Sequence, residues 1–200
     1  MPSVVVRSVR PERRFRLVSL FSVTSSVENS DLFHMSRLLL LIDVFATPAG
    51  DGSIEGLTKL AKLDFLLRYP ANLERALAAR GAKPEEAQVL DFERNSVEAS
   101  MVRFKYGPWD FRYRRFINLL VAKGLVHVYL RGRTVHLGIT HEGREAARLL
   151  KSDDVFSALH SRSLLLKRHL DLGATALMQF IYKTFPELVN LAYGQTINEL

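Results

Sequence analysis

Six basic residues in the middle of the chain have the types and spacing that suit contact with an anionic polymer. Arg131 and Arg133 flank a glycine between two β-branched runs, in "VYLRGRTVHLGI", and three further arginines lie upstream in "DFRYRRFINLL". Arginine donates paired hydrogen bonds to phosphates and to base edges. The sequence therefore predicts a nucleic-acid-binding surface made of Lys105, Arg112, Arg114, Arg115, Arg131 and Arg133.

The net charge of the chain is concentrated in the same region. Residues 101–150 hold ten basic and three acidic residues, an excess that equals the net charge of +7 of the whole chain. Residues 1–30 carry +3, residues 31–100 carry −3, and residues 151–200 are balanced. Such clustering favours an anionic partner, which is DNA, RNA or an acidic protein surface.

Aromatic residues alternate with the cations in "FKYGPWDFRYRRF". Proteins that bind single strands stack bases on such rings. The spacing, however, is that of a helix or strand with a buried side, and it predicts that most of the rings pack in a core. The six rings are Phe104, Tyr106, Trp109, Phe111, Tyr113 and Phe116.

Two histidines accompany the arginine tip. If Arg131-Gly132 is the turn, His127 and His136 face each other across the hairpin. Two imidazoles are too few for a structural zinc site, so we expect them to pack across the strands.

Motifs of catalysis and membrane insertion are missing. The sequence has no Gly-x-x-x-x-Gly-Lys, Gly-x-Gly-x-x-Gly, His-Glu-x-x-His or Gly-x-Ser-x-Gly, and no cysteine. The longest apolar run, "LLLLI", is far shorter than the about 20 residues that span a bilayer, and the N-terminus lacks the pattern of a signal peptide. We therefore expect no enzyme, no cofactor, no metal and no membrane contact, and a cytoplasmic location.

The order of predicted elements suggests how the candidate residues are positioned. Helical periodicity covers residues 31–46, 57–69, 72–80 and 110–124, and an acidic loop covers 81–100. Residues 101–109 read as extended, ending in a Gly-Pro turn. Strands follow at 125–130 and 134–139, Thr140 caps a further helix, and two helical regions reach Pro186.

This order is typical of a winged helix-turn-helix. The predicted fold class is mainly α with a small β-hairpin (α+β), with an additional N-terminal arm and C-terminal helices. The expected organisation is a basic N-terminal arm at 1–30, a winged-helix domain at 31–150 and a C-terminal helical extension at 151–200. The competing interpretation is a generic α+β domain in which the hairpin only covers a helix bundle.

Three segments, "LTKLAKLDFLLRYP", "MVRFKYGPWDFRYRRFINLLVAKGLV" and "GITHEGREAARLL", give the chain a family resemblance. From Asp31 to its C-terminus the chain resembles the winged-helix middle component of bacterial ABC-three-component systems, which work beside an SMC-like ATPase, as in Lamassu-type antiphage defence. Its "KYGPW" turn also resembles the Tyr-Gly-Pro turns of certain prophage antitoxin-type proteins. The arginine-rich arm has no counterpart in the first family.

The resemblance implies a non-catalytic accessory subunit that bridges an SMC-like ABC ATPase and an effector subunit, and that contacts double-stranded DNA, the ATPase or both. For this role we expect exposed apolar area on the C-terminal helix "ALMQFIYKTF". The alternative is a free-standing winged-helix transcriptional regulator that dimerises through its terminal helices and binds a pseudo-palindromic site.

Overall fold

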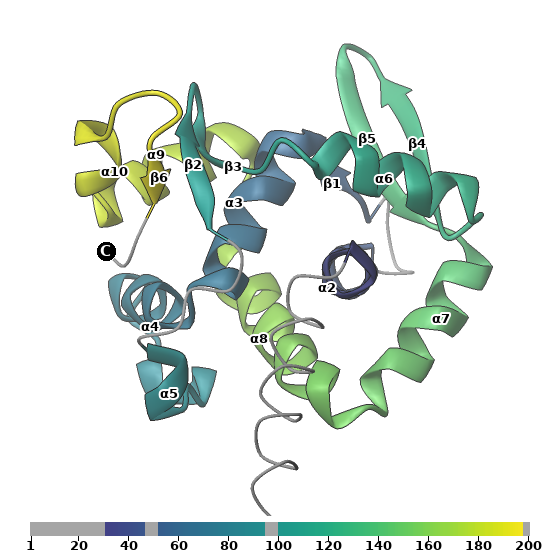
Figure 1. Ribbon diagram of the computed structural model, residues 1–200, viewed down its shortest axis with the longest axis horizontal. Coiled ribbons are helices and arrows are strands. Elements are labelled where there is room, and N and C mark those ends of the chain that lie inside the picture. Colours follow the sequence, from purple (N-terminus) through teal and green to yellow (C-terminus); the bar gives the residue numbers. More distant parts are fainter. Residues whose placement is uncertain (1–30, 47–51, 95–99, 198–200) are drawn as a thin grey trace, which may run out of the picture.

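A buried helix, α2 (Asp31–Phe45), forms the centre of the molecule. Its side chains are buried on every face, as expected for a helix that is apolar all round. Figure 1 shows α2 end-on, with α3 (Gly56–Arg68), α6 (Tyr113–Ala122), α7 (His141–Lys151) and α8 (Asp154–Leu170) around it. The core therefore surrounds one helix.

The computed structural model describes residues 31–46, 52–94 and 100–197. The predicted basic arm at 1–30 lies outside this part. The described chain is mainly helical with two small antiparallel sheets, which confirms the predicted α+β class. The remaining helices are α4 (Pro70–Ala79), η1 (Pro84–Ala87), α5 (Asp91–Arg94), α9 (Ala174–Thr184) and α10 (Glu187–Asn190).

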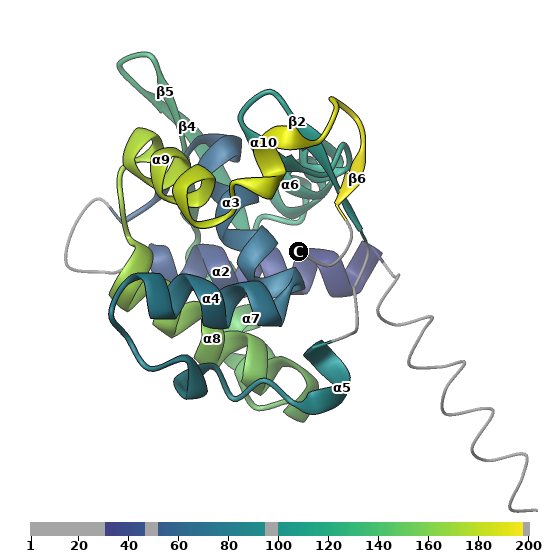
Figure 2. The same ribbon diagram turned by 90° about the vertical axis from the view of Figure 1, so that its left-hand side faces the viewer.

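The first sheet contains the predicted hairpin and one strand that was not predicted. Strands β4 (Val126–Arg131) and β5 (Thr134–Ile139) pair along their whole length, and β1 (Ile54–Glu55) pairs with the other edge of β5. The hairpin projects from the body of the molecule in both views (Figures 1 and 2). The base of the hairpin is buried at Val126 and Leu137, whereas its tip is exposed.

The hairpin turn differs from the predicted one. Arg131 pairs with Thr134, so the two turn residues are Gly132 and Arg133. Gly132 has φ +60°, which suits the first central position of a two-residue turn. Arg131 therefore stays in the ladder, and the predicted pairing of His127 with His136 is wrong.

The second sheet was missed at the sequence level. Strands β2 (Met101–Phe104) and β3 (Gly107–Trp109) form a hairpin, and β6 (Thr196–Ile197) pairs with β2. The turn lies at residues 105–106, and the predicted Gly-Pro turn is wrong because both of its residues belong to β3. The C-terminal residues thus share the core: α8 packs on α2, and α9 packs on α3.

The first turn of helix α7 lies close to Leu125 and Ile139 because Gly143 lacks a side chain. Thr140 caps α7 as predicted, its hydroxyl accepting from the backbone N–H of Gly143 (2.9 Å). A Cβ at Gly143 would lie 2.0 Å from the carbonyl oxygen of Leu125 and 2.7 Å from Cγ1 of Ile139. A backbone oxygen cannot rotate away, so any larger residue must displace the helix.

We expect Gly143→Ala to lower the free energy of unfolding by about 1–3 kcal/mol, the usual cost of overpacking. Urea unfolding measures it. Gly138→Ala is the matched control: its Cβ would meet the ring of His127, 2.4 Å from Nε2, and that exposed ring can rotate. Equal losses in the two variants would contradict this account.

Candidate nucleic-acid interface

Helix α6 carries two of the six predicted basic residues, Arg114 and Arg115, and Arg112 immediately precedes it. It buries Tyr113, Phe116, Ile117 and Leu120 and leaves Arg114, Arg115 and Asn118 exposed. The helix begins three residues after the predicted start, because Asp110 Oδ1 accepts a hydrogen bond from the backbone N–H of Arg112 (2.9 Å). This turn ahead of the helix is typical of aspartate.

A buried carboxylate positions α6 against α2 and α3. Asp64 of α3 accepts from Nε of Arg37 on α2 (2.6 Å), from Nε of Arg68 (2.8 Å) and from the hydroxyl of Tyr113 on α6 (2.7 Å). All four side chains are inaccessible to solvent. Burial alone would raise the pKa of Asp64, but the charges and hydrogen bonds of the two guanidinium groups hold it well below its usual range.

The network continues from Asp64 to the start of α6. Arg68 Nη1 donates to Asp110 Oδ2 (2.8 Å), and Arg112 Nη2 donates to the same oxygen (2.8 Å). Burial opposes ionisation of Asp110, yet its hydrogen bonds from Arg112 and the charge of Arg68 lower its pKa to about 2. Two buried arginines and two aspartates thus balance their charges.

His34 completes the network as a neutral group. Its Nδ1 lies 3.1 Å from Arg37 Nη2, and because a guanidinium only donates, Nδ1 accepts and Nε2 carries the proton. Burial, with the charge of Arg37, lowers the pKa of His34 to about 3. Within the described residues, Nε2 is buried without a hydrogen-bond partner.

Two arginines predicted to contact DNA form ion pairs within the protein. Arg112 pairs with Asp110 and lies over the ring of Phe116, and Arg115 pairs with Asp31 at the start of α2. Their charges are partly neutralised. The sequence did not indicate this, because it showed only that both arginines lie away from the apolar side of the helix. They are weaker candidates than the sequence suggested.

Arg114 and Lys105 lie beside the β2–β3 hairpin. Arg114 is exposed, with no ion pair to any described residue, and it lines a cavity with Tyr106. Lys105 is in the β2–β3 turn, its Nζ 5.4 Å from the centre of the Tyr106 ring. These two cations are therefore grouped at the N-terminal end of α6.

Arg131 and Arg133 occupy the exposed tip of the β4–β5 hairpin, away from the other four predicted residues in sequence and fold. Below them His127, Tyr129 and His136 form a stack, with neighbouring ring centres 5.4 Å apart. Nδ1 of His136 also lies 2.8 Å from the hydroxyl of Ser53. The histidines pack as expected, although each faces a different residue from the one predicted.

The aromatic run divides into buried and exposed rings. Tyr113 and Phe116 are fully buried, as the helical spacing predicts. Phe104, Tyr106 and Phe111 are exposed, and Trp109 is half-buried. Half of the run is therefore accessible to a ligand.

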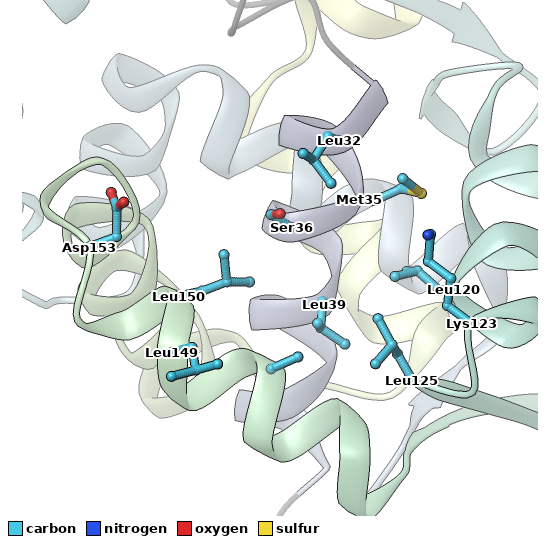
Figure 3. Close-up of a pocket in the computed structure, with 11 residues that line it drawn as sticks. Leu32, Met35, Ser36, Leu39, Leu120, Lys123, Leu125, Leu149, Leu150 and Asp153 are labelled. Atoms are coloured by element: carbon cyan, nitrogen blue, oxygen red, sulfur yellow. The ribbon is translucent and has the colours of Figure 1, made fainter.

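An apolar groove of about 370 Å³ lies between α2, α6 and α7 (Figure 3). Leu32 and Leu39 of α2 face Leu149 and Leu150 of α7 across it, and Lys123 and Asp153 lie at its rim. The predicted exposed apolar helix was α9, but there Leu177 and Ile181 are buried and its other large apolar residues are half-buried. The open apolar surface thus lies elsewhere, because α9 uses its apolar side to cover α3.

Among the residues that the structure describes, no group of three histidine or acidic side chains could hold a metal ion. The described helices also include none that is long and apolar enough to cross a membrane. Comparison with family models, with curated proteins and with solved structures finds no match to this chain.

Sequence reasoning missed Arg37, Asp64 and Arg68, which orient α6. A signal existed: Arg37 interrupts "MSRLLLLI" and Asp64 interrupts "LDFLL", so each charge lies inside an apolar run. A charge in such a position requires a buried partner. The identity of the partner could not be deduced, because the ion pair joins residues 27 positions apart.

We expect Asp64→Asn to lower the free energy of unfolding by about 3–5 kcal/mol, because it leaves Arg37 and Arg68 buried with one carboxylate fewer. Urea unfolding measures the loss. Tyr113→Phe, which removes one hydrogen bond to Asp64, should cost about 1–2 kcal/mol and keep the protein folded. Glu145→Gln, in an exposed ion pair with Arg148, is the control, with an expected change of less than about 1 kcal/mol. A loss for Asp64→Asn no larger than this control would refute the structural role.

His34 should make the protein sensitive to mild acid. Its folded pKa of about 3 lies below the ordinary value of 6.5, so the unfolded chain binds more protons between these values. Stability from this group is therefore present above pH 6.5 and is lost as the pH falls toward 3. Between pH 7 and pH 5 we expect a loss of about 2 kcal/mol in urea unfolding, reduced in His34→Gln. The same pH dependence in both proteins would exclude His34 as its source.

Proposed function

We propose that this protein is a non-catalytic winged-helix accessory subunit of an antiphage defence complex, contacting double-stranded DNA and partner subunits. The observation that carries the winged-helix assignment is the order α2–β1–α3 followed by α6–β4–β5, with β5 between β1 and β4. In this assignment α6 is the recognition helix and β4–β5 is the wing.

The connection between the second and third helices sets this chain apart from a simple helix-turn-helix. Such a motif joins its helices by a turn of about 3–4 residues. Here α4, η1, α5 and the β2–β3 hairpin lie between α3 and α6. A large insertion beside the recognition helix favours a protein that binds partner subunits as well as a DNA duplex, as an accessory subunit does.

The charge distribution supports contact with the DNA backbone. Arg133 lies in the wing turn and Arg131 beside it, while Arg114 projects from the first turn of α6. Because Arg112 and Arg115 pair with aspartates, Arg114 and the arginines of the β4–β5 hairpin are the stronger candidates for contact with a duplex. Separated arginines of this kind suit phosphate contacts, which position a protein without reading sequence.

The role within a complex rests on the sequence resemblance and on the apolar groove. The resemblance points to an SMC-like ABC ATPase and an effector as partners. The groove between α2 and α7 has an apolar lining of the kind that binds the apolar face of a helix, here a helix of the ATPase. Leu32 and Leu149 in this lining are each more than 60 % exposed. Its rim carries one charge of each sign, Lys123 and Asp153, which can pair with polar residues of that helix.

The same groove favours the second candidate, a dimeric transcriptional regulator, if a second copy of this chain fills it. A regulator binds a pseudo-palindromic site with two chains per duplex and half-sites about one helical turn apart. An accessory subunit is expected to bind DNA duplexes of unrelated sequence with similar affinity. Stoichiometry and sequence preference therefore separate the two functions.

We expect the protein to bind two unrelated DNA duplexes with similar affinity, measured by fluorescence anisotropy over a range of salt concentrations. Arg114→Ala should reduce the slope of log affinity against log salt by about 0.9, the value for one lost phosphate contact. Arg115→Ala, on the same helix turn, should change it less because Asp31 pairs with Arg115. Charge reversal of Arg131 and Arg133 together should weaken binding most.

Lys183→Ala, on the exposed side of α9, is the control for net charge. An unchanged salt slope in the wing variant would reject the DNA contact. A strong preference for one palindromic duplex, bound by two chains, would support the regulator instead.

A further inference from the structure

A second cavity, of about 170 Å³, opens between α3, the β2–β3 hairpin and the N-terminal end of α6. It is lined by Thr58 and Lys62 of α3, Phe104, Tyr106 and Trp109 of the hairpin, and Arg114 of α6. A cavity of about 150 Å³ holds one benzene ring, whereas a drug-sized ligand needs about 300 Å³ or more. The space therefore suits a single planar group.

Lys62 brings a buried positive charge to this cavity. The residue is only 2 % exposed, and its Nζ donates one hydrogen bond, to the carbonyl oxygen of Thr58 (3.0 Å). No described carboxylate lies within ion-pair distance of it. Burial lowers the pKa of Lys62 to about 8, so the ammonium still carries its charge at neutral pH, with two N–H groups left to donate.

The other buried cations of α2, α3 and α8 show what Lys62 lacks. Arg37 and Arg68 share Asp64, Lys59 of α3 lies 3.1 Å from Asp171, and Arg162 of α8 lies 2.6 Å from Glu93. A buried charge without a counter-ion is costly, and proteins retain such costs at ligand sites. Arg103 of β2, also buried, likewise has no described carboxylate partner, but it donates to the carbonyl oxygen of Leu188 and lies over two tyrosine rings. Lys62 makes one hydrogen bond and lines a cavity, so its ammonium can pair with an anion that enters there.

The hairpin supplies flat apolar surfaces beside the two cations. Phe104 is 40 % and Tyr106 49 % exposed, and the rings of Phe104 and Trp109 are stacked at 29°, with centres 6.0 Å apart. Exposed aromatic faces next to lysine and arginine are the features with which proteins bind unpaired bases and their phosphates. Arg114 adds a second donor at the mouth of the cavity.

We propose that this cavity binds one unpaired nucleotide, with the base against the aromatic rings and the phosphate on Lys62 and Arg114. The chemistry is the same for a free mononucleotide and for a nucleotide within a single strand. The site shares Arg114 with the proposed duplex contact, but Lys62 and the hairpin rings take no part in that contact.

Trp109 provides a direct readout, because it is the single tryptophan of the chain and lines the cavity. The full-length protein is titrated with adenosine monophosphate, with adenosine, and with a short oligothymidylate, while the fluorescence of Trp109 is recorded. We expect the nucleotide or the oligonucleotide to quench it, and adenosine to bind at least tenfold more weakly. Quenching by both indicates a free nucleotide as ligand, and quenching by the oligonucleotide alone indicates a single strand.

Lys62→Met tests the role of the charge. This variant should stay folded, because it removes an unmatched buried charge, and thermal unfolding checks this. We expect its affinity for the quenching ligand to fall at least tenfold, as for a lost hydrogen bond to a charged group. Lys183→Met, on the surface of α9, should bind like the original protein.

Three results would overturn the proposal: no quenching by either phosphate-bearing ligand at about 1 mM, equal binding of adenosine and its monophosphate, or unchanged affinity in folded Lys62→Met. Unchanged duplex binding in the variant with charge reversal at Arg131 and Arg133, with quenching of Trp109 retained in the original protein, would reject only the duplex contact.

Discussion

The buried carboxylate of Asp64 is the interaction on which the arrangement of α2, α3 and α6 depends. Helix α2 is apolar on every face, so apolar packing alone would accept many rotations about its axis. Only a rotation that brings Arg37 to Asp64 avoids an unpaired buried charge. Desolvation offsets much of the attraction within such a pair, so its main contribution is to orientation rather than to stability.

The same network determines which cations can meet a ligand. A helix N-terminus commonly binds phosphate, but at α6 the carboxylate of Asp110 already takes the backbone N–H of Arg112 and its guanidinium. An anionic ligand therefore has to be met by side chains further along or beside the helix. In the proposed sites those are Arg114 and Lys62, which line one cavity, and the arginines at the tip of the β4–β5 hairpin.

Elements that depend on local patterns were predictable from the sequence, and those that depend on distant residues were not. The helices of ten or more residues, strands β4 and β5 and the Thr140 cap follow from periodicity and capping, and they lie within a few residues of their predicted bounds. The short helices η1 and α5 lie in the segment predicted as an acidic loop. Strands β1 and β6 have two residues each, too few for any periodicity, and each pairs with a segment more than 80 residues away. The candidate site was predictable as a set of cations. Which of them are neutralised was not, because the carboxylates that pair with them come from other elements.

The β4–β5 hairpin and the cavity lined by Lys62 are supported by different parts of the chain. The base of the β4–β5 hairpin is held by β1, and the first turn of α7 lies close to Leu125 and Ile139 at Gly143. The β2–β3 hairpin is held by the C-terminus: β6 pairs with β2, Arg103 Nε donates to the carbonyl oxygen of Leu188 (2.9 Å), and the hydroxyl of Tyr69 joins β2 to β6. The C-terminal segment thus supports the hairpin that lines the cavity. In the same segment, α9 packs its apolar side against α3. A change in β6 or at Leu188 therefore acts directly on the β2–β3 hairpin and on the cavity that it lines.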